Sequence, residues 1–233
     1  MKNYSKYPKY YVAVDCVIFG YDIRKKILKL LLVKRNIDPG KGSWSLAGGF
    51  VKEKESIDDA AARILRKLTG ISKVLLIQSR TYGDTDRDPG ARVISTAYYA
   101  LTGTSEINHE LVKDNGAHWR SVEDLPKLVF DHSKMVKQAL HDLQNLLKTK
   151  PVGFELLPEK FTLVQLQELY EAILRVKVDK RNFRKKILSM DILEKLEEKE
   201  KQTSKKGAWY YTFKKERYDK LSMNGFSFNL DVS

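Results

Sequence analysis

The chain has 233 residues, which fits one large domain or two modest ones and leaves ample length to bury a hydrophobic core. Hydrophobic residues make up 42% and charged residues 31% of it, proportions that argue against wholesale disorder. Its 43 Lys and Arg exceed its 30 Asp and Glu by a formal charge of +13, which favours a polyanionic partner such as nucleic acid, although basic proteins without one are common.

Cysteine content and hydropathy narrow the class of protein further. The one cysteine, Cys16, excludes an internal disulfide and a cysteine-based zinc site, and its apolar surroundings (YVAVDCVIFG) predict a buried position in a strand. The N-terminal stretch MKNYSKYPKY has no apolar signal-peptide core, and no stretch approaches the length of a membrane span. We therefore expect a cytoplasmic protein with no membrane partner.

The first part of the chain, residues 1–150, is predicted to be one domain of mixed α and β structure. Apolar, β-branched or aromatic runs predict strands at 11–20, 27–34, 44–50, 73–82, 92–102 and 117–120, the first two joined as a hairpin. Ser56, with Asp59 three residues later as in a capping box, begins a helix that Gly70 ends. A second helix is expected from about Asp131 to Leu147, because apolar residues recur there with helical spacing.

A change of composition separates this part from the rest. Residues 151–160 lie in KTKPVGFELLPEK, rich in proline and glycine, and are predicted to form a linker to a second domain, 161–233. There Thr162 and Gln165 have capping-box spacing before one helix, and Asp179 can cap the next, KRNFRKKILSM. A segment at 192–200 that is strand-like or frayed, a polar turn (KQTSKKGA) and a strand (WYYTF) follow. Helix, turn, helix and hairpin is the order of a winged helix-turn-helix.

The stretch GGFVKEKESIDDAAARILRKLTGI, residues 48–71, carries the most specific motif. It resembles the Nudix box, G-x5-E-x7-R-E-U-x-E-E-x-G-U with U aliphatic. The residues that fall on this pattern in register are Gly49, Glu55, Arg63, Leu65, Gly70 and Ile71. The resemblance implies a Nudix α/β/α sandwich with a mixed sheet over the first 150 residues. It also implies that Gly49, Glu55, Arg63 and Gly70, here called the Nudix frame, are structural.

The three metal-binding glutamates of the Nudix pattern fall at Ile64, Lys67 and Leu68. Nudix enzymes need these carboxylates, because the divalent cation neutralises phosphate charge and activates the attacking water. Two apolar side chains and an ammonium cannot hold such an ion, so we predict no catalytic residues and no metal. The alternative is a hydrolase with substitute ligands among Glu53, Glu55, Asp58 and Asp59. The first helical turn also favours Asp58 and Asp59 simply as exposed acidic residues.

A polar loop, YGDTDRDPGAR, is the candidate for contacts with a ligand. Such residues could hydrogen-bond sugar or ribose hydroxyls, and arginine could bind phosphate; the alternative is a surface loop satisfied by water and its own turns. The candidate effector-binding residues are Asp84, Asp86, Arg87, Asp88 and Arg92. The four histidines show no metal-binding spacing and are assigned no role.

The basic helix of the second domain is the candidate for DNA recognition. Its apolar residues Phe183, Ile187, Leu188 and Met190 are expected to pack inward while the basic ones face outward, as a helix in the major groove requires. The candidate DNA-binding residues are Lys180, Arg181, Asn182, Arg184 and Lys185 of the helix with Lys205 and Lys206 at the wing tip. The alternative is a solvated basic helix face.

Together the two parts resemble the Nudix-related transcriptional regulators, in which a ligand-sensing Nudix domain precedes a winged-helix DNA-binding domain. Phrases such as SLAGGFVKEKES and DRDPGARVISTAYYAL look most like the arabinose-responsive branch. That implies a homodimeric repressor of sugar-utilisation genes on palindromic operator DNA, with L-arabinose as effector and no cofactor. A sister branch implies ADP-ribose instead, and the alternative activity is a Nudix hydrolase acting on ADP-ribose or a related nucleoside diphosphate derivative.

Overall fold

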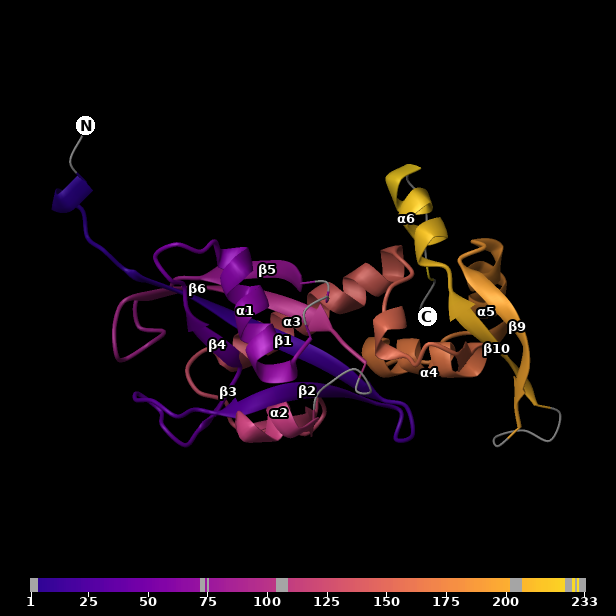
Figure 1. The fold of residues 1–233 in the computed structure, drawn as a ribbon, viewed down its shortest axis with the longest axis horizontal. Helices are drawn as coiled ribbons and strands as arrows, with labels where there is room; N and C mark the ends of the chain where they lie inside the picture. The colour runs from indigo at the N-terminus through magenta and orange to yellow at the C-terminus, as the bar shows by residue number, and fades with distance from the viewer. Residues whose placement is uncertain are drawn as a thin grey trace. The chain divides into compact units, whose positions relative to one another are not determined.

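The computed structural model of the protein describes residues 4–71, 74, 76–103, 109–201, 207–224, 228 and 230. The chain divides into two compact units (Figure 1). The first comprises residues 1–19, 30–100 and 107–139, and the second comprises residues 20–29, 101–106 and 140–233.

A β-sheet organises the first unit. Its strands run in the order β3-β2-β1-β6-β5, with β4 paired to β1 and β7 paired to β2. Their bounds are β1 (Tyr11–Asp22), β2 (Ile27–Lys34), β3 (Trp44–Ser45), β4 (Ala47–Phe50), β5 (Leu76–Tyr82), β6 (Val93–Leu101) and β7 (Ala117–Ser121). The strand expected at 44–50 is two strands, because the backbone N–H of Leu46 between them donates to the His132 ring instead of to a strand.

Helices cover this sheet, with α1 lying across the strands in Figure 1. They are α1 (Ile57–Thr69), α2 (His109–Asp114) and α3 (His132–Thr149), and a 3-10 helix, η1 (Tyr4–Lys6), precedes the sheet. The predicted capping box of α1 is confirmed, since Ser56 and Asp59 exchange both side chain-to-backbone hydrogen bonds. Gly70 ends α1 with φ 77°, a left-handed conformation that a residue without a Cβ adopts at little cost. The sequence did not indicate α2.

The core between α1 and the sheet follows the two-residue period of β1. Val14, Cys16 and Ile18 are fully buried on one face of β1 and belong to a cluster with Leu65 of α1. The Cys16 thiol lies 3.8 Å from the carbonyl oxygen of Ala61. Burial raises the pKa of this thiol, so Cys16 is a packing residue, as predicted.

The second unit contains a helix-turn-helix followed by a hairpin. Its elements are η2 (Phe154–Leu156), β8 (Phe161–Thr162), α4 (Leu163–Leu174), α5 (Lys180–Ser189), β9 (Leu193–Glu200), β10 (Ala208–Phe213) and α6 (Lys215–Asn224). The strand order is β8-β10-β9, all antiparallel. Both predicted caps are confirmed: Thr162 and Gln165 form a capping box, and Asp179 accepts from the Asn182 N–H. The predicted fold class is therefore confirmed, while β8, η2 and α6 were not expected.

Aromatic side chains form much of the core of this unit. Tyr170 of α4 is fully buried, contacts Phe183 of α5 edge-on at 5.1 Å, and donates its hydroxyl to the carbonyl oxygen of Val152. Phe154 stacks on Phe213 of β10 at 4.1 Å between ring centroids. Residues 152 and 154 of the segment expected as a linker thus take part in the packing of the second unit.

Candidate functional site

A cleft of about 360 Å³ opens in the first unit beside the Nudix frame. Its walls come from β1, β2, β4 and α1, from the loop that contains Arg87 and Asp88, and from Phe130 and His132. Ser45, Leu46 and Gly48–Phe50, from the region of the broken strand, also line it.

The Nudix frame braces one side of this cleft. Glu55 accepts from Arg63 Nε at 2.9 Å and from the Lys52 backbone N–H at 2.8 Å, and Arg63 Nη2 also donates to the carbonyl oxygen of Phe50 at 3.1 Å. The hydrogen bond from Arg63 is the main reason why the pKa of Glu55 falls to about 2. The loop after β4 is thereby tied to α1.

Glycine is required where β4 approaches its neighbours. A Cβ on Gly49 would lie 3.3 Å from Ile64 Cδ1, and one on Gly48 would lie 2.2 Å from Asp15 Oδ1. A side chain on Gly48 would therefore displace the Asp15 carboxylate, which stands opposite it on β1, or shift β4 itself. The Nudix motif identified Gly49 as a required glycine. The requirement for glycine at 48 arises from the pairing of β4 with β1, which cannot be read from the sequence.

The α1 face that carries metal ligands in Nudix enzymes faces the cleft here as well. Ile64, Lys67 and Leu68 all line it, as positions i, i+3 and i+4 on one helix face should. No group of three or more His, Cys, Asp or Glu that could hold a metal occurs within the described residues. The side chains present therefore do not fit the divalent cation that the fold family implies.

The suggested substitute ligands are largely engaged elsewhere. Glu55 is paired with Arg63, and the Asp59 carboxylate accepts from the Ser56 backbone N–H in the capping box of α1. Asp58 accepts a hydrogen bond from the Tyr98 hydroxyl. These three carboxylates have structural partners, whereas Glu53 is exposed and forms no hydrogen bond or ion pair among the described residues. One unengaged carboxylate is not a set of ligands for a divalent cation.

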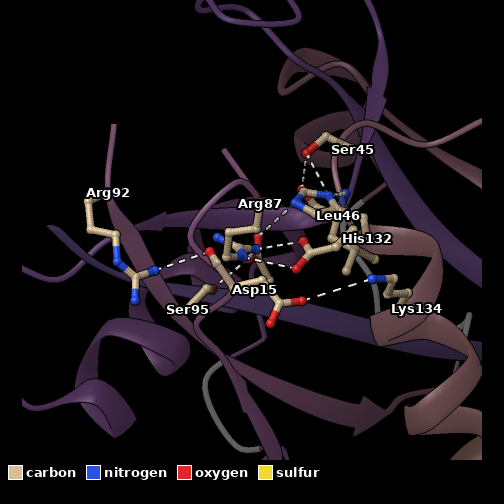
Figure 2. Close-up of polar contacts among 10 residues, drawn as sticks. Asp15, Ser45, Leu46, Arg87, Arg92, Ser95, His132 and Lys134 are labelled. Atoms are coloured by element: carbon tan, nitrogen blue, oxygen red, sulfur yellow. Dashed lines mark hydrogen bonds and ion pairs between the residues drawn. The ribbon is translucent and has the colours of Figure 1, made fainter. Parts of the chain in front are cut away.

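Asp15, Arg87 and His132 line the cleft and belong to a buried polar network, here called the floor of the cleft, whose contacts Figure 2 shows. Arg87 donates to both carboxylate oxygens of Asp131, from Nε at 2.9 Å and Nη2 at 2.8 Å, and Nη2 lies 3.8 Å from Asp15. Asp15 also accepts from the Ser95 hydroxyl at 2.6 Å. His132 accepts the Leu46 N–H through Nδ1 at 3.1 Å.

His132 was assigned no role from the sequence, yet it joins three parts of this floor. Besides Leu46, its Nε2 lies 3.6 Å from Asp15, and its ring meets Phe130 edge-on at 5.7 Å. Burial lowers its pKa, which favours the neutral ring that can accept at Nδ1. The only signal in the sequence was its place in the Nudix-like stretch FDH.

The five candidate effector-binding residues do not form one cluster. Arg87 and Asp88 line the cleft, whereas Asp84 and Asp86 are exposed on the surrounding loop. Arg92 donates to the carbonyl oxygen of Asp84 at 3.1 Å and lies at the edge of the network in Figure 2. Arg87 is buried and neutralised by Asp131, so its position is that of a supporting residue.

The basic helix α5 presents much of its predicted recognition surface. Lys180, Arg181, Asn182 and Lys185 are exposed, and the first three stand at the capped N-terminal end. Phe183 and Ile187 are fully buried, as expected. Charged and amide side chains at this end of a second helix are those that reach phosphates and base edges in helix-turn-helix proteins.

One apolar and one basic residue of α5 lie differently from the expectation. Leu188 does not pack inward: its side chain is 45% exposed, because it lies seven residues after Arg181 and shares that outward face. Arg184 is half-buried, and its Nε has no hydrogen-bond partner within the described part of the chain. Lys205 and Lys206 lie outside the described residues.

The turn between α4 and α5 is held by one carboxylate. Glu171 accepts from the Val178 N–H at 3.2 Å, from Gln167 at 3.1 Å and from the Lys177 ammonium at 2.8 Å. Arg175 ends α4 in a left-handed conformation with φ 60°. Glu171 thereby sets the path of the chain into the capped end of α5.

Comparison with known proteins gives these two units a family. Residues 9–139 match the model of the NUDIX domain, and residues 153–213 match the NrtR DNA-binding winged helix domain. A relative from Acinetobacter baylyi, the ADPR responsive transcriptional repressor NtrR, is 31% identical over 92% of this chain and 86% of its own length. The chain belongs to the NrtR family of transcriptional regulators.

Solved NrtR structures resemble this one over both units. Shewanella oneidensis NrtR in complex with a 27-mer DNA has 28% identity and a TM-score of 0.81, covering 89% of this chain and 95% of that one. The NUDIX domain of the same protein in complex with ADP-ribose has 27% identity and a TM-score of 0.51, covering 60% of this chain and 93% of that one. Among the described residues of this NrtR-family chain, no helix is long and apolar enough to cross a membrane.

Proposed function

We propose that this protein is a ligand-responsive repressor that binds a palindromic operator as a homodimer, with α5 in the major groove. The observation that carries the proposal is the exposed set Lys180, Arg181 and Asn182 at the capped start of α5, in a unit that matches a DNA-binding family. Two-fold symmetry of a dimer would mirror the symmetry of such an operator.

We propose ADP-ribose as the effector, bound in the cleft of the first unit. The Acinetobacter relative is named as responsive to ADPR, and the Shewanella NUDIX domain was crystallised with ADP-ribose. The cleft lining, which includes Arg35 and Lys67, suits an anionic diphosphate. The sequence resemblance suggested L-arabinose as effector and a role in sugar utilisation. The comparisons support neither.

Repression without hydrolysis is part of the proposal. With Ile64 and Leu68 on the α1 face, the cleft lacks carboxylates at the positions where Nudix enzymes hold their cation. The ligand would then act only by its different affinity for the DNA-binding and non-binding states of the protein. A sensor that does not consume its ligand can report its concentration at equilibrium.

The proposal is tested by fluorescence anisotropy with labelled DNA from upstream of the neighbouring genes. We expect nanomolar, salt-dependent affinity for a palindromic fragment, which ADP-ribose lowers and L-arabinose leaves unchanged. If L-arabinose lowers the DNA affinity and ADP-ribose does not, the effector is L-arabinose and the proposal of ADP-ribose is wrong. If none of the upstream fragments binds, the proposed repressor function is wrong.

Variants of α5 test which residues bind the operator. Arg181→Ala combined with Asn182→Ala should weaken specific binding by about 10-fold or more, since each good base contact contributes about 1–3 kcal/mol. Lys137→Ala removes the same charge from an exposed position on α3 and should leave affinity unchanged. Equal affinity of both variants would refute the assignment of α5.

A further inference from the structure

The α1 face that would hold a cation in a Nudix enzyme holds a fixed positive charge in this protein. Lys67 stands between Ile64 and Leu68 on the cleft wall, and its side chain is exposed. Its backbone carbonyl accepts from the Asn115 side chain at 3.2 Å, and Asn115 also lines the cleft. The C-terminal part of α1 is thus anchored while the ammonium stays available.

The cations of the cleft fall into two groups. Arg63 is paired with Glu55, and Arg87 is paired with Asp131, so neither offers uncompensated charge. Lys67 forms no ion pair within the part of the chain that the structure describes.

Arg35 belongs with Lys67 rather than with the paired arginines, whereas the Lys34 ammonium lies away from the cleft, over Trp44. Lys34 donates to the carbonyl oxygen of Gly42 and lies 4.0 Å from the Trp44 ring centroid. Arg35 donates to the carbonyl oxygen of Pro39 and lies 5.1 Å from the Phe130 ring. Val33 packs against α1, so its neighbour Lys34 points to the opposite face of β2, whereas Arg35 and Phe130 both line the cleft. Lys67 and Arg35 are therefore the cleft cations without an ion pair within the described residues.

We propose that Lys67, with Arg35, supplies the positive charge that a divalent cation supplies in Nudix enzymes, so that this protein binds a diphosphate ligand without metal. The inference rests on the proposed function, because it takes ADP-ribose as the ligand. An ammonium donates charge-assisted hydrogen bonds to phosphate oxygens, as a phosphate-binding lysine does elsewhere. It cannot polarise a water molecule into a nucleophile, which separates binding from hydrolysis.

Isothermal titration of the full chain with ADP-ribose, in EDTA and in Mg²⁺, tests the proposal. We expect the same Kd in both buffers for the wild type. Lys67→Met should raise Kd about 10- to 100-fold in both, the loss of a charge-assisted hydrogen bond. Lys67→Glu should bind more weakly than Lys67→Met in EDTA, because it adds like-charge repulsion.

Arg66→Met is the matched control. Arg66 is the exposed neighbour of Lys67 on α1 and does not line the cleft, so its removal takes away the same charge and should leave Kd unchanged. Circular dichroism melting of each variant verifies that it is folded. Wild-type binding that needs Mg²⁺, or equal Kd values for Lys67→Met and Arg66→Met, would overturn the role of Lys67 and leave the repressor function standing. No binding of ADP-ribose by the wild type in either buffer would overturn the proposed effector as well.

Discussion

The Arg87–Asp131 ion pair predicts a large and specific loss of stability when the arginine is removed. Both side chains are almost fully buried, with 3% and 7% of their surfaces exposed, and two hydrogen bonds join them. Arg87→Met keeps much of the side-chain volume but leaves the Asp131 carboxylate, and Asp15 nearby, without this cation. Breaking such a pair costs about 3–5 kcal/mol of unfolding free energy, because a buried charge is left uncompensated.

A double-mutant cycle separates this cause from a general loss of packing. Adding Asp131→Asn to Arg87→Met removes the orphaned charge, so the double variant should be less destabilised than the sum of the single variants. We expect a coupling energy of about 1–3 kcal/mol, as for residues in one buried network. Arg92→Met serves as a control, since Arg92 makes one hydrogen bond at the edge of the network and should cost about 1 kcal/mol or less.

Urea denaturation followed by circular dichroism measures these differences as shifts in midpoint at constant slope. A cost below about 1 kcal/mol for Arg87→Met, or strictly additive losses, would refute the supporting role inferred for Arg87. A large effect of Arg92→Met would show that the loop, rather than the buried pair, determines stability.

Three further predictions concern other parts of the molecule. Burial puts the pKa of His132 below its ordinary 6.5, so the unfolded chain takes up a proton before the folded chain does. The free energy of unfolding should therefore fall as pH drops below about 6.5, by up to about 1.4 kcal/mol per pH unit. His132→Asn keeps an acceptor and should show a shallower dependence on pH in urea denaturation between pH 7 and 5.5. Glu171→Ala should weaken operator binding in anisotropy assays, since the turn into α5 loses its acceptor for the Val178 N–H, and unchanged affinity would contradict that role. Gly48→Ala should lower the thermal midpoint by several degrees because its methyl would meet a carboxylate oxygen at 2.2 Å, whereas Gly83→Ala, with nothing within 4 Å, should melt as the wild type.

Local features of the fold were predictable because they depend on residues close together in the chain. The capping boxes that begin α1 and α4 each need two residues three positions apart, and a pattern of that length can be read directly. Gly70 at the end of α1 follows the same logic. The fixed spacing of the Nudix motif likewise placed Glu55 beside Arg63.

The floor of the cleft was not predictable, since its members come from distant positions. Asp15, Arg87 and His132 meet only after β1, a loop and the start of α3 have been assembled. A loop rich in charge suggested that Arg87 would contact a ligand, but the sequence could not show that Asp131 would neutralise it. The outward position of Leu188 was missed for a related reason, because a single helical turn does not fix which of two adjacent apolar residues faces the core.

The pairing of charges explains how the Nudix frame can persist while the metal ligands change. Glu55 and Arg63 neutralise one another, so the ion pair that ties the loop after β4 to α1 needs no metal cation. It also involves none of the side chains at 64, 67 and 68. Replacing three carboxylates there by two apolar groups and an ammonium therefore alters the sign of the charge facing the cleft without unbalancing the frame. A cleft with carboxylates on this helix face can accept a diphosphate only with a cation between them, whereas one with Lys67 there attracts the diphosphate directly. In the proposed repressor, the substitutions at 64, 67 and 68 would therefore separate binding of an anionic ligand from its hydrolysis.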